Sequence, residues 1–485
     1  MRLSYLAYTF SLITKYLGIV MLVPIVIAIF YKEYSAIFPF FVSFLILFLF
    51  SVLLKTKKTV REIKSINDIK KTEGLFVVFF SWVLAGVFSA VPFLFFHLSP
   101  LEALFEATSG ITTTGATIFT HFDYPKTLFF WRSFIQWLGG MGIIVLFIAI
   151  LPQFAIAGRQ LFFAEAPGPT EEKFTPRIKN TASSLWKIYF GLTVLEIILL
   201  KANGFTFFDA LCDSLSTVSG GGFSPCQTSF VGVPNVVLWI ICFFMFCAGV
   251  NYNLQYQAFS KLNPSILFKN EEFRIYMLIV LILSLLLTFS LFVNSNYDIV
   301  NSISNSFFQV VSVISTVGFC SVDFSSWDYP SKAILFIAMC AGSCASSAGG
   351  GIKIMRWLLI FKIMKVEMAK ILHSKAVFNI KIDKYSISNE ILHQTLMFVS
   401  FYILILVISA LIIAILEQNT AVGISSAVSA IGNIGPGLGR IIGPLDNYAN
   451  LSDLSKVILI IDMYVGRLEL IQFLVLFQKG FWNFK

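Results

Sequence analysis

The chain has 485 residues, of which 57% are hydrophobic and 16% aromatic, while only 13% carry a charge. Soluble domains carry about 25% charged residues, so a soluble fold of this composition would lack the polar surface to cover itself. The mean hydropathy of +0.83 also argues against a soluble fold. The composition therefore excludes a soluble enzyme, a secreted disulfide scaffold and a disordered protein, and it indicates a chain that crosses a membrane several times.

The net charge of +9 is concentrated in short basic blocks between apolar stretches. Residues 55–71 hold seven Lys or Arg against two acids, and a second block runs from Lys353 to Lys384. Blocks of this kind beside hydrophobic segments mark cytoplasmic loops. A nucleic-acid-binding protein would need a folded basic domain or motif, and the sequence has none. We therefore expect membrane lipid, and no nucleic acid, around this chain.

Apolar stretches long enough to form membrane-spanning helices recur along the chain. The N-terminal segment has no convincing signal-peptide cleavage site, and with residues 34–54 it predicts two helices ahead of the first basic block. Further candidate spans are 74–101, 133–158, 188–200, 214–260, 275–297, 333–352, 391–416, 418–439 and 455–477. The stretch 214–260 starts with Gly-rich sequence, so we expect a re-entrant loop followed by a helix there.

Four segments of the chain align on one glycine each, which predicts an internal repeat. The four glycines are Gly115, Gly222, Gly318 and Gly435. Six residues earlier a serine stands in every copy: Ser109, Ser216, Ser312 and Ser429. The segments before the glycines predict half-helices at about 101–110, 207–217, 299–313 and 420–430, each too short to span the membrane. Each unit therefore reads as helix, half-helix, Gly-containing loop and helix.

The repeats predict a division of the chain into five parts. Residues 1–72 hold two extra N-terminal helices and a basic cytoplasmic loop. The four repeat units follow at 73–182, 183–270, 271–385 and 386–485, and the third includes a Gly-rich intramembrane loop.

The four loops offer the chemistry that a dehydrated cation requires. Rings of backbone carbonyls from four loops can replace the water around an ion, and glycine allows the backbone conformations that such a strand needs. The half-helices would direct the negative ends of their dipoles at the same axis. The candidate filter residues are Thr112, Thr113, Thr114, Gly115, Gly220, Gly221, Gly222, Thr316, Val317, Gly318, Asn433, Ile434 and Gly435. An ordinary turn or helix contact would explain any one of these glycines, whereas four in register favour an ion filter.

The sequence resembles the Trk-type potassium uptake proteins, the membrane subunits of the Trk/Ktr/HKT superfamily, over nearly its whole length. The segments that carry the resemblance are SGITTTGAT (109–117), STVGF (315–319), GNIGPGLG (432–439), CASSAGGGIKIMR (344–356) and GRLE (466–469). The resemblance implies an all-α integral membrane protein of four M1–P–M2 (helix–re-entrant pore loop–helix) repeats around one pore, plus two extra N-terminal transmembrane helices. The second loop, with three glycines and no Thr, departs most from the family pattern.

The resemblance also implies a function and its partners. It implies potassium uptake across the bacterial cytoplasmic (inner) membrane, with K⁺ at the filter residues and with no covalent cofactor or enzymatic activity. A homodimer and a cytosolic nucleotide-binding regulatory subunit are the expected assembly.

A gate is expected below the filter. Gly349, Gly350 and Gly351 end a run of small residues and are expected to break a helix within the membrane, although such runs also serve close helix packing. Arg467 lies deep in the last apolar segment, where a charge is costly. Its alternatives are pairing with Asp462, with Glu469 or with backbone carbonyls. In the resembling family the matching loop gates the pore, and the matching Arg projects into it as an electrostatic barrier.

The orientation and mechanism follow from the charges. Cytoplasmic basic blocks place the four loops on the outer side, and the inside-negative potential contributes about 2.3 kcal/mol per 100 mV to each inward K⁺. The four histidines are scattered, which favours a channel-like mechanism over a proton relay, while coupling to H⁺ or Na⁺ stays open. A secondary transporter of another ion or small solute is the alternative, although it would usually show inverted repeats. Asp123 and Asp328 precede helices near the outer mouth and are expected to cap them, with cation attraction as the alternative.

Overall fold

The computed structural model describes residues 3–55, 71–142, 178–294, 298–373, 376, 378–383 and 385–468. The regular structure in these ranges is helical except for an antiparallel pair of two-residue strands, β1 (Lys381–Ile382) and β2 (Tyr385–Ser386). Six helical stretches of the described chain are long and apolar enough to cross a membrane. A further pair, α12 (Asn235–Gly249) and α13 (Tyr252–Ser260), is bent by 105°. The expected all-α membrane fold is confirmed.

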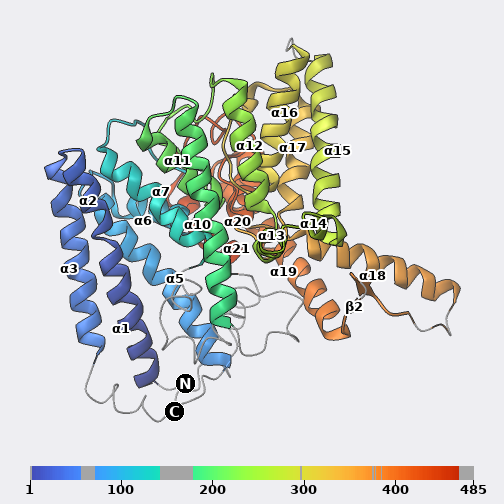
Figure 1. Ribbon diagram of the computed structural model, residues 1–485, viewed down its shortest axis with the longest axis horizontal. Coiled ribbons are helices and arrows are strands. Elements are labelled where there is room, and N and C mark those ends of the chain that lie inside the picture. Colours follow the sequence, from blue (N-terminus) through green and yellow to red (C-terminus); the bar gives the residue numbers. More distant parts are fainter. Residues whose placement is uncertain are drawn as a thin grey trace.

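The two extra N-terminal helices form a hairpin beside the rest of the molecule (Figure 1). Their elements are α1 (Leu3–Val20), α2 (Val23–Phe30), the 3₁₀ turn η1 (Tyr34–Ala36) and α3 (Ile37–Leu54). Helix α1 packs against α3, and both contact the first helix of the next unit. The first basic block falls almost entirely on residues 56–70, which lie outside the described chain.

Four helix–short helix–helix units follow. Their first helices are α5 (Lys71–Leu94), α10 (Ile178–Ala202), α15 (Glu271–Asn294) and α19 (Asn389–Leu416). Their short helices are α6 (Pro100–Ile111), α11 (Phe207–Ser219), α16 (Ile299–Ile314) and α20 (Thr420–Gly432). Their second helices are α7 (Lys126–Gly140), α12, α17 (Tyr329–Ala341) and α21 (Asp453–Arg467). The expected half-helices agree with the observed short helices to within two residues at each end.

The four units close into a ring. In each unit the first helix packs along the short helix. The second helix then packs against the short helix of the following unit, in the pairs α7–α11, α12–α16, α17–α20 and α21–α6. Because the last pair joins the fourth unit to the first, the four short helices surround a common axis. Figure 1 shows these short helices in the upper half of the molecule.

The second helix of the third unit ends earlier than its sequence predicts. The glycine triplet 349–351 was expected to break this helix, but α17 ends at Ala341 and the chain stays non-helical until α18 (Ile354–Leu372). The break occurs at Gly342, where φ is +73° and a Cβ atom would collide with the carbonyl oxygen of Ile352. Glycine alone adopts this conformation without steric cost, so the helix stops at the first glycine of the run. We call residues 342–353 the inner loop.

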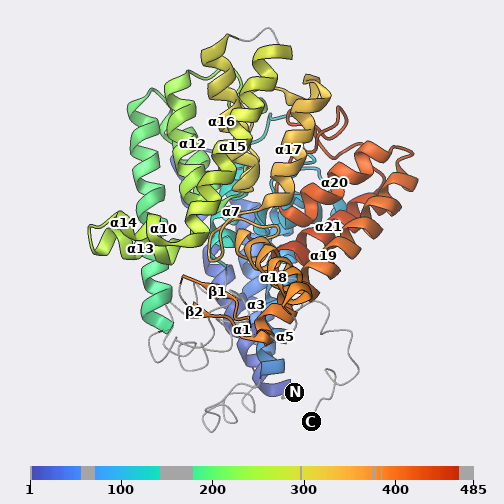
Figure 2. The same ribbon diagram turned by 90° about the vertical axis from the view of Figure 1, so that its right-hand side faces the viewer.

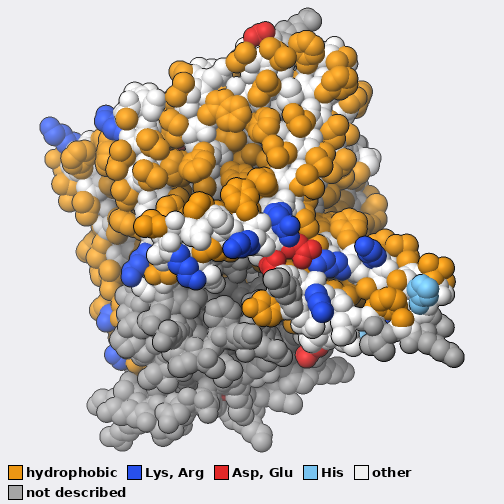
Figure 3. Space-filling model, turned by 45° about the vertical axis from the view of Figure 1, so that its right-hand side comes forward, with side chains coloured by type: hydrophobic (Ala, Val, Ile, Leu, Met, Phe, Trp, Pro, Cys, Tyr) orange, Lys and Arg blue, Asp and Glu red, His pale blue; other side chains and the backbone are white. Residues whose placement is uncertain are grey.

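The outer surface of the helices is apolar. Large side chains such as Phe38, Leu285 and Phe289 are 61–68% exposed on helices long enough to span a bilayer. Figure 3 shows this apolar surface with Lys and Arg side chains along its lower border, and Figure 2 shows α18 at a similar level, below α16 and α17. Short connecting elements, α13, α14 (Ser265–Lys269) and η3 (Phe324–Ser326), complete the described chain.

Candidate cation pathway

Each short helix ends in a loop with the same backbone signature. Two residues before the aligned glycine, φ is +56° at Thr113, +72° at Gly220, +58° at Thr316 and +51° at Asn433. At the aligned glycine itself, φ is +83° at Gly115, +76° at Gly222, +86° at Gly318 and +105° at Gly435. Positive φ is uncommon for residues other than glycine, and it persists only where the surroundings enforce it. The repeat found in the sequence is therefore also a repeat of backbone geometry.

The four loops touch one another in chain order. A Cβ atom added to Gly115 would collide with the carbonyl oxygen of Gly221 in the second loop. The same addition at Gly222 meets the Val317 oxygen, and at Gly318 it meets the Ile434 oxygen. At Gly435 the added atom would lie 2.7 Å from the carbonyl oxygen of Thr114, which returns the series to the first loop. The loops therefore form a closed ring, and no side chain fits at any of its four glycines.

The carbonyl oxygens in these contacts share one repeat position. They belong to the residue directly before the aligned glycine: Thr114, Gly221, Val317 and Ile434. All thirteen candidate filter residues lie in this ring or in the two residues that lead into it. We call these four groups the ring carbonyls.

A cavity lies on one side of the ring. The four aligned glycines line it together with the loops that follow them, including Phe119, Asp446 and Tyr448. The Tyr448 hydroxyl donates to the Gly435 carbonyl oxygen at 2.8 Å. Partial burial, with a contribution from the nearby Asp323 carboxylate, raises the pKa of Asp446 above its ordinary value. The ring is thus reached from this side through a mouth that carries a carboxylate.

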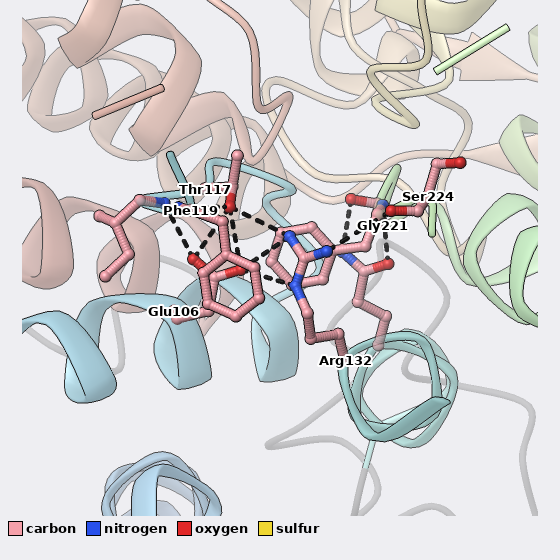
Figure 4. A network of polar contacts seen from close by, with 9 residues as sticks. Glu106, Thr117, Phe119, Arg132, Gly221 and Ser224 are labelled. Carbon is pink, nitrogen blue, oxygen red and sulfur yellow. Dashed lines mark hydrogen bonds and ion pairs between the residues drawn. The ribbon is translucent and has the colours of Figure 1, made fainter. Parts of the chain in front are cut away.

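A buried ion pair next to the second loop holds the chain that leaves the first loop. Figure 4 shows Arg132 of α7 between Glu106 of α6 and the segment from Gly221 to Ser224. The Arg132 Nε donates to Glu106 at 2.8 Å, and its Nη2 donates to Thr117 Oγ1 at 3.0 Å. The exposed fractions of the Arg132 and Glu106 side chains are 2% and 0%. Glu106 also accepts from the backbone N–H of Ile118 at 2.9 Å. The pair therefore ties the chain leaving the first loop to α6 and α7.

Aromatic rings surround this guanidinium. The centre of the guanidinium lies 4.5 Å from the ring centroid of Phe119 and 4.1 Å from that of Phe223, the residue after the second loop glycine. Such contacts favour a desolvated cation electrostatically. The start of α7 is held from elsewhere, because Glu33 accepts from the N–H groups of Lys126 and Thr127 at 2.8 and 2.9 Å. The N-terminal hairpin thereby supports the helix that carries Arg132.

The inner loop lies against the other side of the ring. The Gly350 N–H donates to Thr316 Oγ1 at 2.8 Å. A Cβ atom on Gly349 would approach the Ser315 carbonyl oxygen to 2.7 Å, and one on Gly350 would approach the Gly432 oxygen to 2.6 Å. Ser315 and Gly432 are the residues by which the chain enters the third and fourth loops. The inner loop therefore covers the end of the ring opposite the cavity.

Arg467, the last residue of α21, fastens the inner loop to α7. Its guanidinium donates to the Ala348 carbonyl oxygen at 2.6 Å and to the carbonyl oxygens of Gly139 and Gly140 at 2.6 and 2.8 Å. Backbone carbonyls, one of the alternatives for Arg467, are thus its partners here. Asp462, another alternative, accepts instead from Ser409 at 2.9 Å, and Glu469 lies outside the described residues.

Comparison with known proteins identifies the family. Residues 36–482 match the TrkH family, described as a cation transport protein. The Trk system potassium uptake protein TrkH of Salmonella typhimurium is 37% identical over 425 residues, which cover 86% of this chain and 87% of the relative. TrkG of Escherichia coli, also named a Trk system potassium uptake protein, is 31% identical over 96% of this chain and 95% of its own length. The chain belongs to the TrkH family of cation transport proteins.

A solved TrkH-family structure has the same fold. The crystal structure of the potassium transporter TrkH from Vibrio parahaemolyticus superimposes with a TM-score of 0.87 at 30% identity, and the match covers all of both chains. The TrkH fold and the apolar helices identify a multi-pass inner-membrane protein, and the family identifies a membrane transport protein rather than an enzyme. The domain boundaries and the roles of the individual site residues stay predictions.

Sequence reasoning missed the side chains of α7. The expected span begins at Ser133, directly after Arg132, because a charged residue ordinarily ends an apolar segment. In this TrkH-family chain α7 begins at Lys126 and buries Arg132 against Glu106, and residues 143–158 lie outside the described chain. The sequence signal for this ion pair is one acid, Glu106, in a short helix and one base, Arg132, in the apolar helix that follows.

The expected capping role of two aspartates is wrong. The N-cap residue of α7 is Pro125, and Glu33 rather than Asp123 accepts from the N–H groups at its start. Asp328 occupies the N-cap position of α17, but its carboxylate accepts from Ser290 and Asn294 of α15 instead of capping its own helix. The start of α7 and the Asp328 carboxylate both bond to residues of other elements, which a local sequence pattern does not reveal.

Proposed function

We propose that this chain carries K⁺ inward across the membrane through the ring of backbone carbonyls at its four loops. The observation that carries the proposal is the closed series of contacts between each loop glycine and a carbonyl oxygen of the next loop. Potassium is the ion named for relatives at 37% and 31% identity. The proposed filter residues are those predicted from the sequence, with K⁺ as the transported ion rather than a resident cofactor.

The mechanism is replacement of water by protein oxygens. An ion entering from the mouth loses its hydration shell to the ring carbonyls, whose position the packed loops fix. The C-terminal ends of α6, α11, α16 and α20 lead into the loops, so their carbonyl-rich ends favour a cation there. The membrane potential then contributes about 2.3 kcal/mol per 100 mV to inward movement, so no catalytic group is required.

We assign the gate to the inner loop and Arg467. The inner loop lies directly on the inner end of the ring, and the Arg467 bridge to the Ala348 carbonyl holds it there. The guanidinium adds a positive charge on the exit side that repels a departing cation. Flux in this proposal requires the bridge to break or the inner loop to withdraw.

The remaining partners belong to the same proposal. The relatives are named as parts of a Trk system, which supports a multi-component assembly. We propose a homodimer of this chain and a cytosolic nucleotide-binding regulatory subunit, which acts on the gate from the cytoplasmic side. Mass measurement of the purified complex in detergent, with and without a co-expressed subunit, tests both.

The decisive experiment measures ion flux through the purified protein in liposomes at a set potential. The wild type is expected to pass K⁺ well above Na⁺. Gly318→Ser should abolish this preference or the flux itself, because φ is +86° there and the added atoms would collide with Ile434 and Pro436. The matched control is Gly191→Ser, since a Cβ atom at Gly191 of α10 meets nothing within 4 Å.

Two results would contradict the proposal. If the wild type carries neither ion at any potential, with or without a cytosolic partner, the secondary-transporter alternative takes its place. If Gly318→Ser keeps the wild-type preference for K⁺, the ring does not select the ion. Equal losses in Gly318→Ser and Gly191→Ser would trace the effect to folding rather than to the ring.

A further inference from the structure

The second loop has fewer polar side chains near its aligned glycine than the other three loops. The hydroxyls of Thr112 and Thr114 in the first loop lie 2.8 Å apart, and Thr316 in the third accepts from the inner loop. Asn433 in the fourth loop donates to Thr114 and to the Met463 carbonyl, at 2.9 and 3.0 Å. At the two positions directly before its aligned glycine the second loop has Gly220 and Gly221, which carry no side chain, and the Ser219 hydroxyl before them donates to the Ser216 carbonyl of its own helix at 3.0 Å. Three consecutive glycines are also the most flexible backbone available.

One side chain of α7 bonds to this loop on both sides of its aligned glycine. The Gln136 Nε2 donates to the Gly221 carbonyl oxygen at 2.6 Å. The Gln136 Oε1 accepts from the N–H of Phe223 at 3.0 Å. Gln136 is completely buried, and both ends of its carboxamide are used. A neutral amide that donates and accepts in this way takes the place of a neighbouring backbone strand.

Gly221 and the Gln136 side chain are packed closely together. The three atoms nearest to a Cβ atom added at Gly221 all belong to the Gln136 side chain, the farthest of them, Cγ, at 2.8 Å. The φ angle of Gly221 is not in the positive range, so its backbone would accept an alanine. Position 221 therefore requires glycine because Gln136 fills the space of a side chain, and not because the backbone there has a positive φ angle.

We propose that Gln136 is a selectivity-determining positioning residue, which fixes the Gly221 carbonyl as one of the four ring carbonyls. This inference rests on the proposed function, since Gly221 matters for selectivity only if the ring binds the ion. A carbonyl on an unrestrained three-glycine loop can move toward a smaller ion, and the ring then binds Na⁺ almost as well as K⁺. The Gln136 N–H occupies one lone pair of the Gly221 oxygen and leaves the second for the cation. Gln136 thus restrains from α7 a carbonyl whose own loop has no side chain at positions 220 and 221.

The test compares two buried glutamines. Gln136→Leu keeps the approximate size of the side chain and removes both hydrogen bonds to the loop. Gln255→Leu is the matched control, because Gln255 is also buried and donates to two backbone carbonyls, of Cys247 and Val250, outside the ring. In liposomes the K⁺/Na⁺ flux ratio should fall about fivefold or more in Gln136→Leu and stay at the wild-type value in Gln255→Leu.

A second pair of variants keeps the proposal testable if Gln136→Leu does not fold. Gly221→Ala places a methyl group where the Gln136 side chain lies and should displace it from the loop. The K⁺/Na⁺ flux ratio should then fall. Gln136→Ala alone should also lower the ratio, and the double variant should lower it no further, because either change already breaks both hydrogen bonds to the loop. A merely structural role would change thermal stability without this mutual dependence of the flux ratio.

The outcomes separate this inference from the proposed function. Gln136→Leu protein that conducts with the wild-type K⁺/Na⁺ ratio overturns the role of Gln136 and leaves the filter proposal standing. An unchanged ratio in Gly221→Ala does the same. A wild type that does not distinguish K⁺ from Na⁺ overturns both proposals together.

Discussion

Replacing Arg467 with alanine is expected to raise the cation flux that the protein passes without any partner. The guanidinium joins the Ala348 carbonyl of the inner loop to the Gly139 and Gly140 carbonyls of α7. Withdrawal of the inner loop breaks the bond to Ala348 and leaves the bonds to α7 intact. The cost of opening that Arg467 imposes is therefore the cost of this one charged hydrogen bond.

The size of the effect follows from that bond. A hydrogen bond to a charged group contributes about 1.5–3 kcal/mol. Since about 1.4 kcal/mol corresponds to a factor of ten, its loss should shift the closed-to-open equilibrium by about 10- to 150-fold. Basal flux should rise by the same factor as long as the open fraction stays small. Loss of the positive charge from the exit side acts in the same direction.

The assay is K⁺ uptake into liposomes that contain the purified chain alone. Arg467→Lys separates the bridge from the charge, because lysine keeps the charge but lacks the planar fork that binds several carbonyls at once. We expect Arg467→Lys to raise flux at least about tenfold. The control is Arg274→Ala, which removes an exposed arginine of α15.

Three results would refute this reasoning. Wild-type flux through folded Arg467→Ala protein would mean that the bridge does not hold the gate shut. Arg467→Lys with wild-type flux beside a raised Arg467→Ala would assign the effect to charge alone. An equal rise in Arg274→Ala would trace it to positive surface charge rather than to the inner loop.

Two further predictions concern the mouth and the loops. Glu106→Gln should destabilise the protein by about 3–5 kcal/mol, because it leaves the charge of the buried Arg132 uncompensated. A lowered unfolding temperature checks this. The double variant Glu106→Gln with Arg132→Met should recover part of the lost stability. Asp446→Asn should lower K⁺ uptake about two- to fivefold at low ionic strength and have little effect at high salt. Because the pKa of Asp446 is raised, external acid should lower wild-type uptake at a higher pH than an ordinary aspartate would, and Asp446→Asn should abolish that component.

The repeated backbone of this protein could be predicted from its sequence, because it rests on local signals. Glycine at one position, serine six residues earlier and an apolar stretch on either side placed each short helix to within two residues of its observed ends. Positive φ at the aligned glycines follows from the same residue preference. These features depend on residues close together in the chain, which a pattern can register.

The supports of the ring could not be predicted in the same way. Gln136 and Gly221 are 85 residues apart, and Arg467 and Gly139 are 328 apart, so no local pattern joins them. The early end of α17 at Gly342 depends on close contact with Ile352, which the small-residue run alone does not disclose. Long-range contacts of this kind decide at which of several glycines a helix ends and which of several polar residues supports the ring.

When one chain folds into a ring of four loops, each loop, or corner of the ring, is encoded separately and can mutate alone. In a pore assembled from four identical subunits, every inherited substitution appears at all four corners and must be tolerated four times over. Here a change at Val317 would alter one corner and leave Thr114, Gly221 and Ile434 as they are. In the proposed filter, ion preference can therefore shift by small inherited steps, and a loop without side chains of its own can persist where a neighbouring helix supports it.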